Sequence, residues 1–285
     1  MKFVSFRHNG RAGFGALKDG GIVDLARVAA DLRHLLGMGD KGRDAAAKAV
    51  AAAKTTVALD QIELLPPIPN PGTVWCAGMN THSHYEEVKA LLNLKEEPPK
   101  PILFIRNTNT LVASGQDLEK PRLEKTFDYE GEIALVIGKR GRAIAVANAT
   151  DYLAGYSCFN DASGRDYQRS SSQFTAGKNG YRSGGFGPWL VTRDDIDEKG
   201  MVMTCRVNGA EVQRMPLNDL IFDFAQLISF ISEFTWVEPG DVIVTGSPSG
   251  VGFLRKPPVL LKAGDKVEVE VSGVGVLVNG VRDQP

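Results

Sequence analysis

Hydrophobic and polar positions alternate in short runs along most of the chain, a pattern typical of β-strands. Residues 266–271 alternate strictly, which predicts a half-buried strand. Further short hydrophobic runs predict strands at residues 2–6, 22–25, 73–77, 102–105, 132–137, 189–191, 202–207 and 241–245. Many short strands with few helices between them favour a β-rich mixed α+β architecture over a doubly wound parallel sheet.

Helical periodicity is confined to a few stretches. One set of apolar residues follows the i, i+3, i+4, i+7 spacing and predicts an amphipathic helix: Leu217, Leu220, Ile221, Phe224, Leu227, Ile228 and Ile231. Two shorter helical stretches are predicted at residues 25–37 and 42–54.

Prolines and glycines indicate how the chain is divided. Gly10, Gly13 and Gly15 predict turns near the N-terminus. Four prolines between residues 66 and 71 cannot lie inside a helix or a central strand, so residues 66–72 are predicted to be a linker. We therefore expect a small N-terminal α/β unit at residues 1–65 and a catalytic domain at residues 73–285.

Composition excludes several classes of protein. The chain of 285 residues is 43% hydrophobic and 24% charged, as is ordinary for a globular protein. Its net charge of −1 gives no bulk attraction to nucleic acid or to an anionic membrane. Because the sequence has no long apolar run and its first residues are charged, we expect neither a transmembrane helix nor a signal peptide. Three widely spaced cysteines without a CxxC motif argue against disulfides and a thiolate zinc site, so we expect a cytoplasmic setting.

An acidic group is the first candidate site. Glu130 and Glu132 are two residues apart, so in a strand their side chains point to the same face, and Gly131 leaves room behind them. With Asp161 they offer an all-oxygen set of ligands, which suits Mg²⁺, Mn²⁺ or Ca²⁺ better than zinc. Pairs of glutamates on a solvated strand face are also common, and the residues alone leave that alternative open.

A second candidate lies at residues 80–87. In a helix, His84 and Glu87 are i, i+3 neighbours that can share a hydrogen bond, and a carboxylate on one imidazole nitrogen raises the basicity of the other. Such a pair can deprotonate water. A plain surface helix with two histidines, His82 and His84, is the alternative. A charged, proline-containing run at residues 95–100 suggests that the segment is a mobile lid.

Two further segments carry polar groups at turns. Arg165 and Gln168 are three residues apart and can present donors to a carboxylate or keto oxygen. Lys178 follows in a glycine-rich loop. Thr245 ends a predicted strand that runs into a Gly/Ser turn at residues 246–252, where exposed amides can bind an anion. Each of these features also occurs in ordinary surface loops and turns.

In their order along the chain, these segments resemble the fumarylacetoacetate hydrolase family. The resemblance covers roughly residues 70–285 and rests on four patterns. They are N-x-x-x-H-x-x-E at residues 80–87, D-Y-E-x-E at residues 128–132 with the strand after it, N-D-x-S-x-R-D-x-Q at residues 160–168, and G-D-V-I-V-T-G-S-P at residues 240–248. Thr81 in place of a frequent Tyr, the extra His82, Gly164 in place of Ala and Arg106 near a frequent Lys depart from the pattern.

The resemblance implies a β-rich domain, a homodimer and one Mg²⁺ or Mn²⁺ per subunit. The implied metal ligands are Glu130, Glu132 and Asp161, and the implied catalytic residues are His84, Glu87 and Lys178. The residues expected to bind the substrate are Arg165, Gln168, Thr245, Tyr181 and Arg106.

We expect a hydrolase that cleaves a C–C bond of an acylpyruvate, giving pyruvate and a carboxylic acid. A fumaryl- or maleyl-type acyl group would fit aromatic compound catabolism. The alternative on the same scaffold is a decarboxylase or isomerase of a 2-oxo diacid, such as oxaloacetate or a 2-hydroxymuconate-type compound. A metal-dependent binder of 2-oxo acids without activity is a third possibility, disfavoured because a binder does not need a base.

Overall fold

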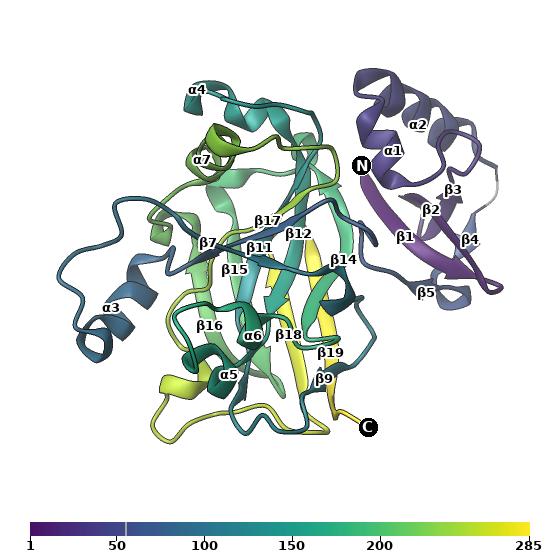
Figure 1. Cartoon of the computed structure of the whole chain (residues 1–285). Helices are drawn as coiled ribbons and strands as arrows, with labels where there is room; N and C mark the ends of the chain where they lie inside the picture. Colours follow the sequence, from purple (N-terminus) through teal and green to yellow (C-terminus); the bar gives the residue numbers. More distant parts are fainter. Residues whose placement is uncertain (55) are drawn as a thin grey trace.

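The computed structural model describes residues 1–54 and 56–285 (Figure 1). The chain forms a strand-rich α+β fold with three sheets, of twelve, five and two strands, which confirms the fold class expected from the sequence. No helix among the described residues is long and apolar enough to cross a membrane.

The twelve-stranded sheet runs through both the N-terminal part and the rest of the chain. Along its main path the order is β4 (Val57–Ala58), β3 (Gly21–Asp24), β2 (Arg11–Lys18), β1 (Lys2–His8), β14 (Gly184–Thr192), β12 (Leu153–Asp161), β11 (Gly131–Ile137), β17 (Val242–Val244), β6 (Val74–Gly78) and β7 (Ile102–Arg106). Off this path, β5 (Glu63–Leu64) pairs with β1, and β8 (Leu111–Val112) pairs with β14.

The two smaller sheets complete the strands. The five-stranded sheet has the order β16 (Ala210–Pro216), β15 (Val202–Val207), β18 (Lys266–Val271), β19 (Gly275–Asp283) and β9 (Leu118–Lys120). The two-stranded sheet pairs β10 (Phe127–Asp128) with β13 (Ser163–Gly164).

Helices are short and peripheral. They are α1 (Leu32–Gly37), α2 (Asp40–Ala52), α3 (His82–Leu92), α4 (Val146–Ala149), α5 (Arg165–Arg169), α6 (Thr175–Lys178) and α7 (Phe224–Phe234). Single 3₁₀ turns occur at Leu59–Gln61, Thr108–Thr110, Thr150–Tyr152, Arg193–Asp195, Glu198–Gly200, Leu217–Asp219 and Gly252–Leu254.

The amphipathic helix begins later than its periodicity predicts. Asp223 caps α7 by accepting from the amide of Gln226, whose side chain accepts from the Asp223 amide in return. This reciprocal cap starts the helix at Phe224. The apolar residues that precede it, beginning at Leu217, lie in a 3₁₀ turn and an irregular segment instead.

Strand β11 is buried on both faces, and this places the acidic pair. Ile133, Leu135 and Ile137 pack into the core between the large sheet and the five-stranded sheet. Ala134 and Val136 face a second core on the opposite side. Because side chains alternate along a strand, the even-numbered glutamates 130 and 132 belong to this second side.

The second core joins the N-terminal part to the main sheet. It contains Phe3, Phe14 and Leu35 from the first 65 residues together with Phe186 and Leu190 of β14. Strand β1 also pairs directly with β14. The division into a small unit, a linker and a catalytic domain stays a prediction.

The N-terminal glycines do not all form turns. Gly13 and Gly15 lie inside β2, and a Cβ atom on Gly15 would come within 2.2 Å of the Val23 carbonyl oxygen. Gly15 therefore allows β2 and β3 to approach closely, and Gly13 lies against the Phe6 ring of β1, so neither forms the turn predicted from the glycine pattern.

Candidate active site

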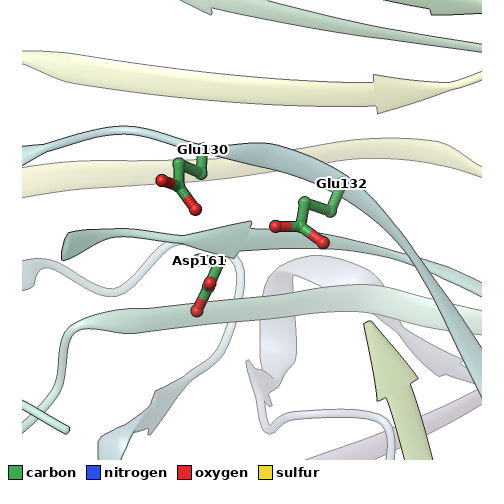
Figure 2. A group of neighbouring side chains, drawn as sticks. All are labelled: Glu130, Glu132 and Asp161. Carbon is green, nitrogen blue, oxygen red and sulfur yellow. The ribbon is translucent and has the colours of Figure 1, made fainter. Parts of the chain in front are cut away.

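Three carboxylates converge where β11 and β12 lie side by side (Figure 2). Glu130 directly precedes β11, Glu132 lies within it, and Asp161 is the last residue of β12. One oxygen from each side chain lies within 4.8 Å of the others, and all three residues are buried. The structure therefore brings together the three predicted metal ligands.

Three cationic side chains surround the carboxylates. The Lys178 ammonium lies 2.5 Å from an oxygen of Glu130 and 2.5 Å from an oxygen of Asp161. Arg165 contacts the other oxygen of Glu130 at 2.5 Å, and Arg106 contacts the other oxygen of Asp161 at 2.5 Å. Glu132 has no such partner and accepts a hydrogen bond from the amide of Gly246.

This asymmetry separates the pKa values of the two glutamates. Burial alone would raise the pKa of Glu130, but the charges of Arg165 and Lys178 outweigh it and lower the pKa to about 2. Burial, with the negative charges of Asp161 and Glu130, raises the pKa of Glu132 well above its ordinary value. The pKa of Lys178 is raised because Asp161 and Glu130 outweigh the effect of its burial.

The acidic group has the properties that a hard divalent cation requires. All three side chains offer oxygen atoms, and hard cations prefer oxygen ligands. Burial is the main cause of the raised pKa of Glu132, and the negative charges of Asp161 and Glu130 add to it, so a cation bound here would relieve both effects. Three carboxylates serve Mg²⁺ and Mn²⁺ equally well, so the donor set does not discriminate between them.

Helix α3 carries the predicted histidine–glutamate pair. The His84 Nδ1 atom lies 2.9 Å from a carboxylate oxygen of Glu87, whose second oxygen accepts from the amide of Gly250 at 2.8 Å. Both side chains are partly exposed, at 13% for His84 and 21% for Glu87. The extra His82 instead contacts Glu97 at the surface.

A small cavity of about 50 Å³ connects these groups. It is lined by the three carboxylates, by four of the other predicted site residues (His84, Arg165, Gln168 and Lys178) and by several residues that were not among the predicted site residues. The full set is Ala77, Gly78, Met79, His84, Phe104, Glu130, Glu132, Asp161, Arg165, Gln168, Phe174, Lys178 and Ser247. Within this set, Gln168 accepts a hydrogen bond from Arg165 at 2.8 Å.

Three of the residues expected to bind substrate lie outside this lining. The Thr245 hydroxyl is buried and donates to the Ile133 carbonyl oxygen at 3.1 Å. Tyr181 is 54% exposed. Arg106 is fully buried behind Asp161 and donates to Ser183 at 2.6 Å. Their substrate-binding roles stay predictions, and for Arg106 the contacts favour support of Asp161 over direct contact with a substrate.

Several residues of the site were missed from the sequence. Asp128 anchors Arg165 through Nε at 3.0 Å and accepts from the amides of Gly252 and Phe253. Its place two residues before Glu130 was a usable signal. Phe104 carried none, because an aromatic residue in a short apolar run indicates a core position as readily as a cavity wall, and Phe174 is a single aromatic residue in a polar segment.

Residues 73–282 match the family described as fumarylacetoacetate (FAA) hydrolase C-terminal. "Oxaloacetate tautomerase fahd2, mitochondrial" from Xenopus laevis is 37% identical over 273 residues, covering 93% of this chain and 84% of that protein. A fumarylacetoacetate hydrolase from Exiguobacterium antarcticum superposes with a TM-score of 0.82 at 31% identity, over 100% of both chains.

A more distant likeness concerns the fold alone. Maleylpyruvate hydrolase from Sphingobium sp. SYK-6, solved in complex with manganese(II) and pyruvate, has a TM-score of 0.83 over 100% of both chains. Its sequence is 22% identical to this chain.

Proposed function

Because the chain belongs to the fumarylacetoacetate hydrolase family, we propose that it is a divalent-metal-dependent enzyme that interconverts the keto and enol forms of oxaloacetate. The observation that carries the proposal is the buried group of three carboxylates facing a cavity that is also lined by Lys178 and His84. The Xenopus relative, named as an oxaloacetate tautomerase, supports this choice of reaction over C–C bond hydrolysis.

Glu130, Glu132 and Asp161 are the residues that would hold the cation. A bound divalent cation would supply Lewis-acid stabilisation of the negative charge that develops on the oxygen of a 2-oxo acid during enolisation. Mg²⁺ and Mn²⁺ both remain candidates for this role.

The chain's own residues provide the proton transfers. Tautomerisation moves one proton from C3 of oxaloacetate to the oxygen on C2. An ionised Glu87 only accepts hydrogen bonds, so Nδ1 of His84 carries the proton, and Nε2 is free to accept one from C3. Lys178 is the candidate donor to the C2 oxygen. Proton exchange with water then restores both residues.

Arg165 and Gln168 are the candidates for orienting the substrate. Both line the cavity, and the hydrogen bond between them holds the guanidinium at one side of it. A guanidinium is suited to binding a carboxylate through two parallel hydrogen bonds. Its contacts with Asp128 and Glu130 keep it ionised, and they raise the pKa of Arg165 above its ordinary value despite the burial.

Hydrolysis of an acylpyruvate is the second candidate function. The observation that favours it is the contact between His84 and Glu87, because a base of this kind beside the cavity can activate water. In this reaction water attacks the distal carbonyl, and Lys178 protonates the leaving pyruvate carbanion. A role in aromatic compound catabolism belongs to this second candidate.

One experiment separates the candidates. The purified protein is mixed with the enol form of oxaloacetate, and loss of the enol absorbance is followed with Mg²⁺, with Mn²⁺ and with a chelator. Pyruvate is measured in parallel, from oxaloacetate and from a panel of acylpyruvates. Metal-dependent loss of the enol without pyruvate release supports tautomerisation.

The other outcomes reassign the reaction. Pyruvate from an acylpyruvate identifies a hydrolase, and pyruvate from oxaloacetate identifies a decarboxylase. Glu132→Gln is expected to abolish the metal-dependent rate, because it removes a charged ligand. Glu233→Gln is the matched control, since this glutamate is exposed on α7 and far from the site in sequence.

The assembly and location of the protein are proposals that follow from the family. We propose a homodimer, which light scattering coupled to size-exclusion chromatography tests directly. The cytoplasm remains our proposed location, although the name of the Xenopus relative places that protein in mitochondria.

A further inference from the structure

The cavity has two sides of different chemistry. The charged side consists of the three carboxylates with Lys178, Arg165 and His84. The rest of the lining includes three large apolar side chains, Phe104, Phe174 and Met79, which form its apolar side. A substrate whose 2-oxo acid head lies on the charged side must therefore direct the rest of its chain toward these apolar residues.

The two phenylalanines form a packed pair. Their ring centroids are 5.7 Å apart and their planes are inclined by 83°, which is the edge-to-face arrangement that aromatic rings favour. Phe104 comes from β7, at the edge of the large sheet, and Phe174 directly precedes α6. The Lys178 ammonium lies 5.1 Å from the centre of the Phe104 ring, so the pair borders the charged side directly.

Neighbouring backbone holds the Phe174 ring in place. A Cβ atom added to Gly78 would lie 3.3 Å from the ring, so Phe174 rests closely on the end of β6. The Phe174 carbonyl also accepts a hydrogen bond from the Lys178 amide at 3.1 Å. One short segment thus carries both the aromatic ring and the ammonium.

The space between the two sides is small. A buried water needs about 10–15 Å³ of this kind of volume. The cavity of about 50 Å³ therefore holds on the order of four waters, which is comparable to a compact 2-oxo acid and too small for an extended acyl chain.

We propose that the Phe104–Phe174 pair is the specificity determinant that limits this site to short 2-oxo acids, with a chain of about four carbons as the limit. The proposal rests on the proposed function for the placement of the 2-oxo acid head. The rings line the apolar side of the cavity, so each further methylene group must be accommodated against them, and the Phe174 ring already rests on the end of β6. Removal of one ring opens that side without altering the charged one.

Phe174→Ala is the informative substitution. It removes one wall of the cavity and leaves the carboxylates, Lys178 and Arg165 in place. Phe104→Ala is less suitable because it also removes the ring next to the Lys178 ammonium. Phe234→Ala is the matched control, because Phe234 also belongs to an edge-to-face pair, with Phe230 at 5.8 Å, but does not line the cavity.

The test measures binding, so it does not depend on turnover. Isothermal titration of the Mn²⁺-loaded protein gives the Kd of unbranched 2-oxo acids from pyruvate to 2-oxooctanoate. In the wild type and in Phe234→Ala we expect affinity to fall at least about tenfold once the chain exceeds four carbons. In Phe174→Ala that fall should disappear, while the Kd of pyruvate changes less than about threefold.

The outcomes distinguish this proposal from the function on which it rests. If the affinity of the wild type does not depend on chain length, or if the length limit is unchanged in Phe174→Ala, the proposed role of the two phenylalanines is wrong. The proposed function is unaffected by either result. Failure of every 2-oxo acid to bind the loaded protein overturns both. If 2-oxo acids bind with the expected length limit but oxaloacetate is not turned over, the role of the two phenylalanines is supported and only the proposed reaction is contradicted.

Discussion

Gly131 lies between the two glutamates of the site and faces away from them. A Cβ atom at this position would be 2.8 Å from Cβ of Cys205 and 2.8 Å from Sδ of Met203, both in β15 of the five-stranded sheet. Its amide also donates to the side chain of Gln213 at 2.9 Å. The five-stranded sheet therefore packs tightly against β11 at Gly131, the residue between the two predicted metal ligands Glu130 and Glu132.

Gly131→Ala is expected to reduce both stability and metal affinity. Overpacking of a filled core costs about 1–3 kcal/mol, and relief of the clash requires β11 to shift. Urea denaturation should show a loss in this range, and titration with Mn²⁺ should show weaker binding. Gly200→Ala is the control, because a Cβ there has no neighbour within 4 Å. Equal stability of the two variants would contradict the close contact.

Metal binding is expected to release a proton. Burial and the charges of Asp161 and Glu130 raise the pKa of Glu132, so below that pKa the carboxyl group is protonated until a cation replaces the proton. Affinity should therefore rise with pH up to this pKa and then level off. Titration calorimetry with Mn²⁺ in two buffers of different ionisation enthalpy measures the released proton as a difference in apparent binding enthalpy. Glu132→Gln should abolish this difference.

At the level of single residues, much of the site was predictable. The spacing of Glu130 and Glu132 placed both on one face of a strand, and the structure brings the predicted third carboxylate, Asp161, close to them. Arg106 was expected to bind the substrate, and that role stays a prediction. Its contact with Asp161 could not be predicted from the sequence, because it depends on which strands pack together over a separation of 55 residues.

Elements with strong hydrophobic patterns were predicted well, and elements rich in glycine were not. The expected strands at residues 202–207 and 266–271 coincide with β15 and β18. Strand β2 was missed because its glycines were interpreted as turns. Strand β12 was also missed, although it ends at Asp161, because polar residues interrupt its apolar pattern.

Helix α3 is attached to the rest of the site at its N-terminal end. The Ser83 hydroxyl donates to Asp219 at 2.5 Å and accepts from the amide of Ser249 at 3.1 Å, and the Ser83 amide also donates to Asp219, at 3.0 Å. A lid movement of the kind predicted from the sequence would have to break these contacts or be confined to the part of the segment that follows Ser83. The helix carries His84 and Glu87 but none of the three carboxylates.

Ser83→Ala should therefore lower the catalytic rate without weakening the metal site. We expect kcat to fall about tenfold to a hundredfold, since small misplacement of a base is costly, and the Kd for Mn²⁺ to stay within about twofold. Steady-state kinetics and metal titration provide the two measurements. Ser172→Ala serves as the control at an exposed serine. Parallel loss of rate and of metal affinity would argue against an independent role for this attachment.

On the scale of the whole molecule, the N-terminal part shares its core with the main sheet. Phe3, Phe14, Leu32 and Leu35 are buried against residues of β14 and other strands. In Figure 1 the N-terminal strands and the two helices α1 and α2 lie on the side of β14. The match to the family begins only at residue 73, outside this part.

A protein comprising residues 73–285 alone is expected to lack cooperative unfolding. Each large apolar side chain removed from a core costs about 1.5–3 kcal/mol, and several are lost together, against a total stability of about 5–15 kcal/mol. Thermal denaturation followed by near-UV circular dichroism compares this fragment with the full chain. A sharp transition at a similar temperature would instead support the catalytic domain predicted from the sequence.

The net charge of the buried side chains at the site predicts the order in which a cation and a substrate bind. Arg106, Arg165 and Lys178 face four buried carboxylates, those of Asp128, Glu130, Glu132 and Asp161. With all seven side chains ionised, this group has a net charge of −1, and one bound divalent cation would change it to +1. The doubly negative oxaloacetate ion is attracted to this group only when the cation is bound. We therefore expect an ordered binding sequence in which the cation binds first and the anionic substrate second.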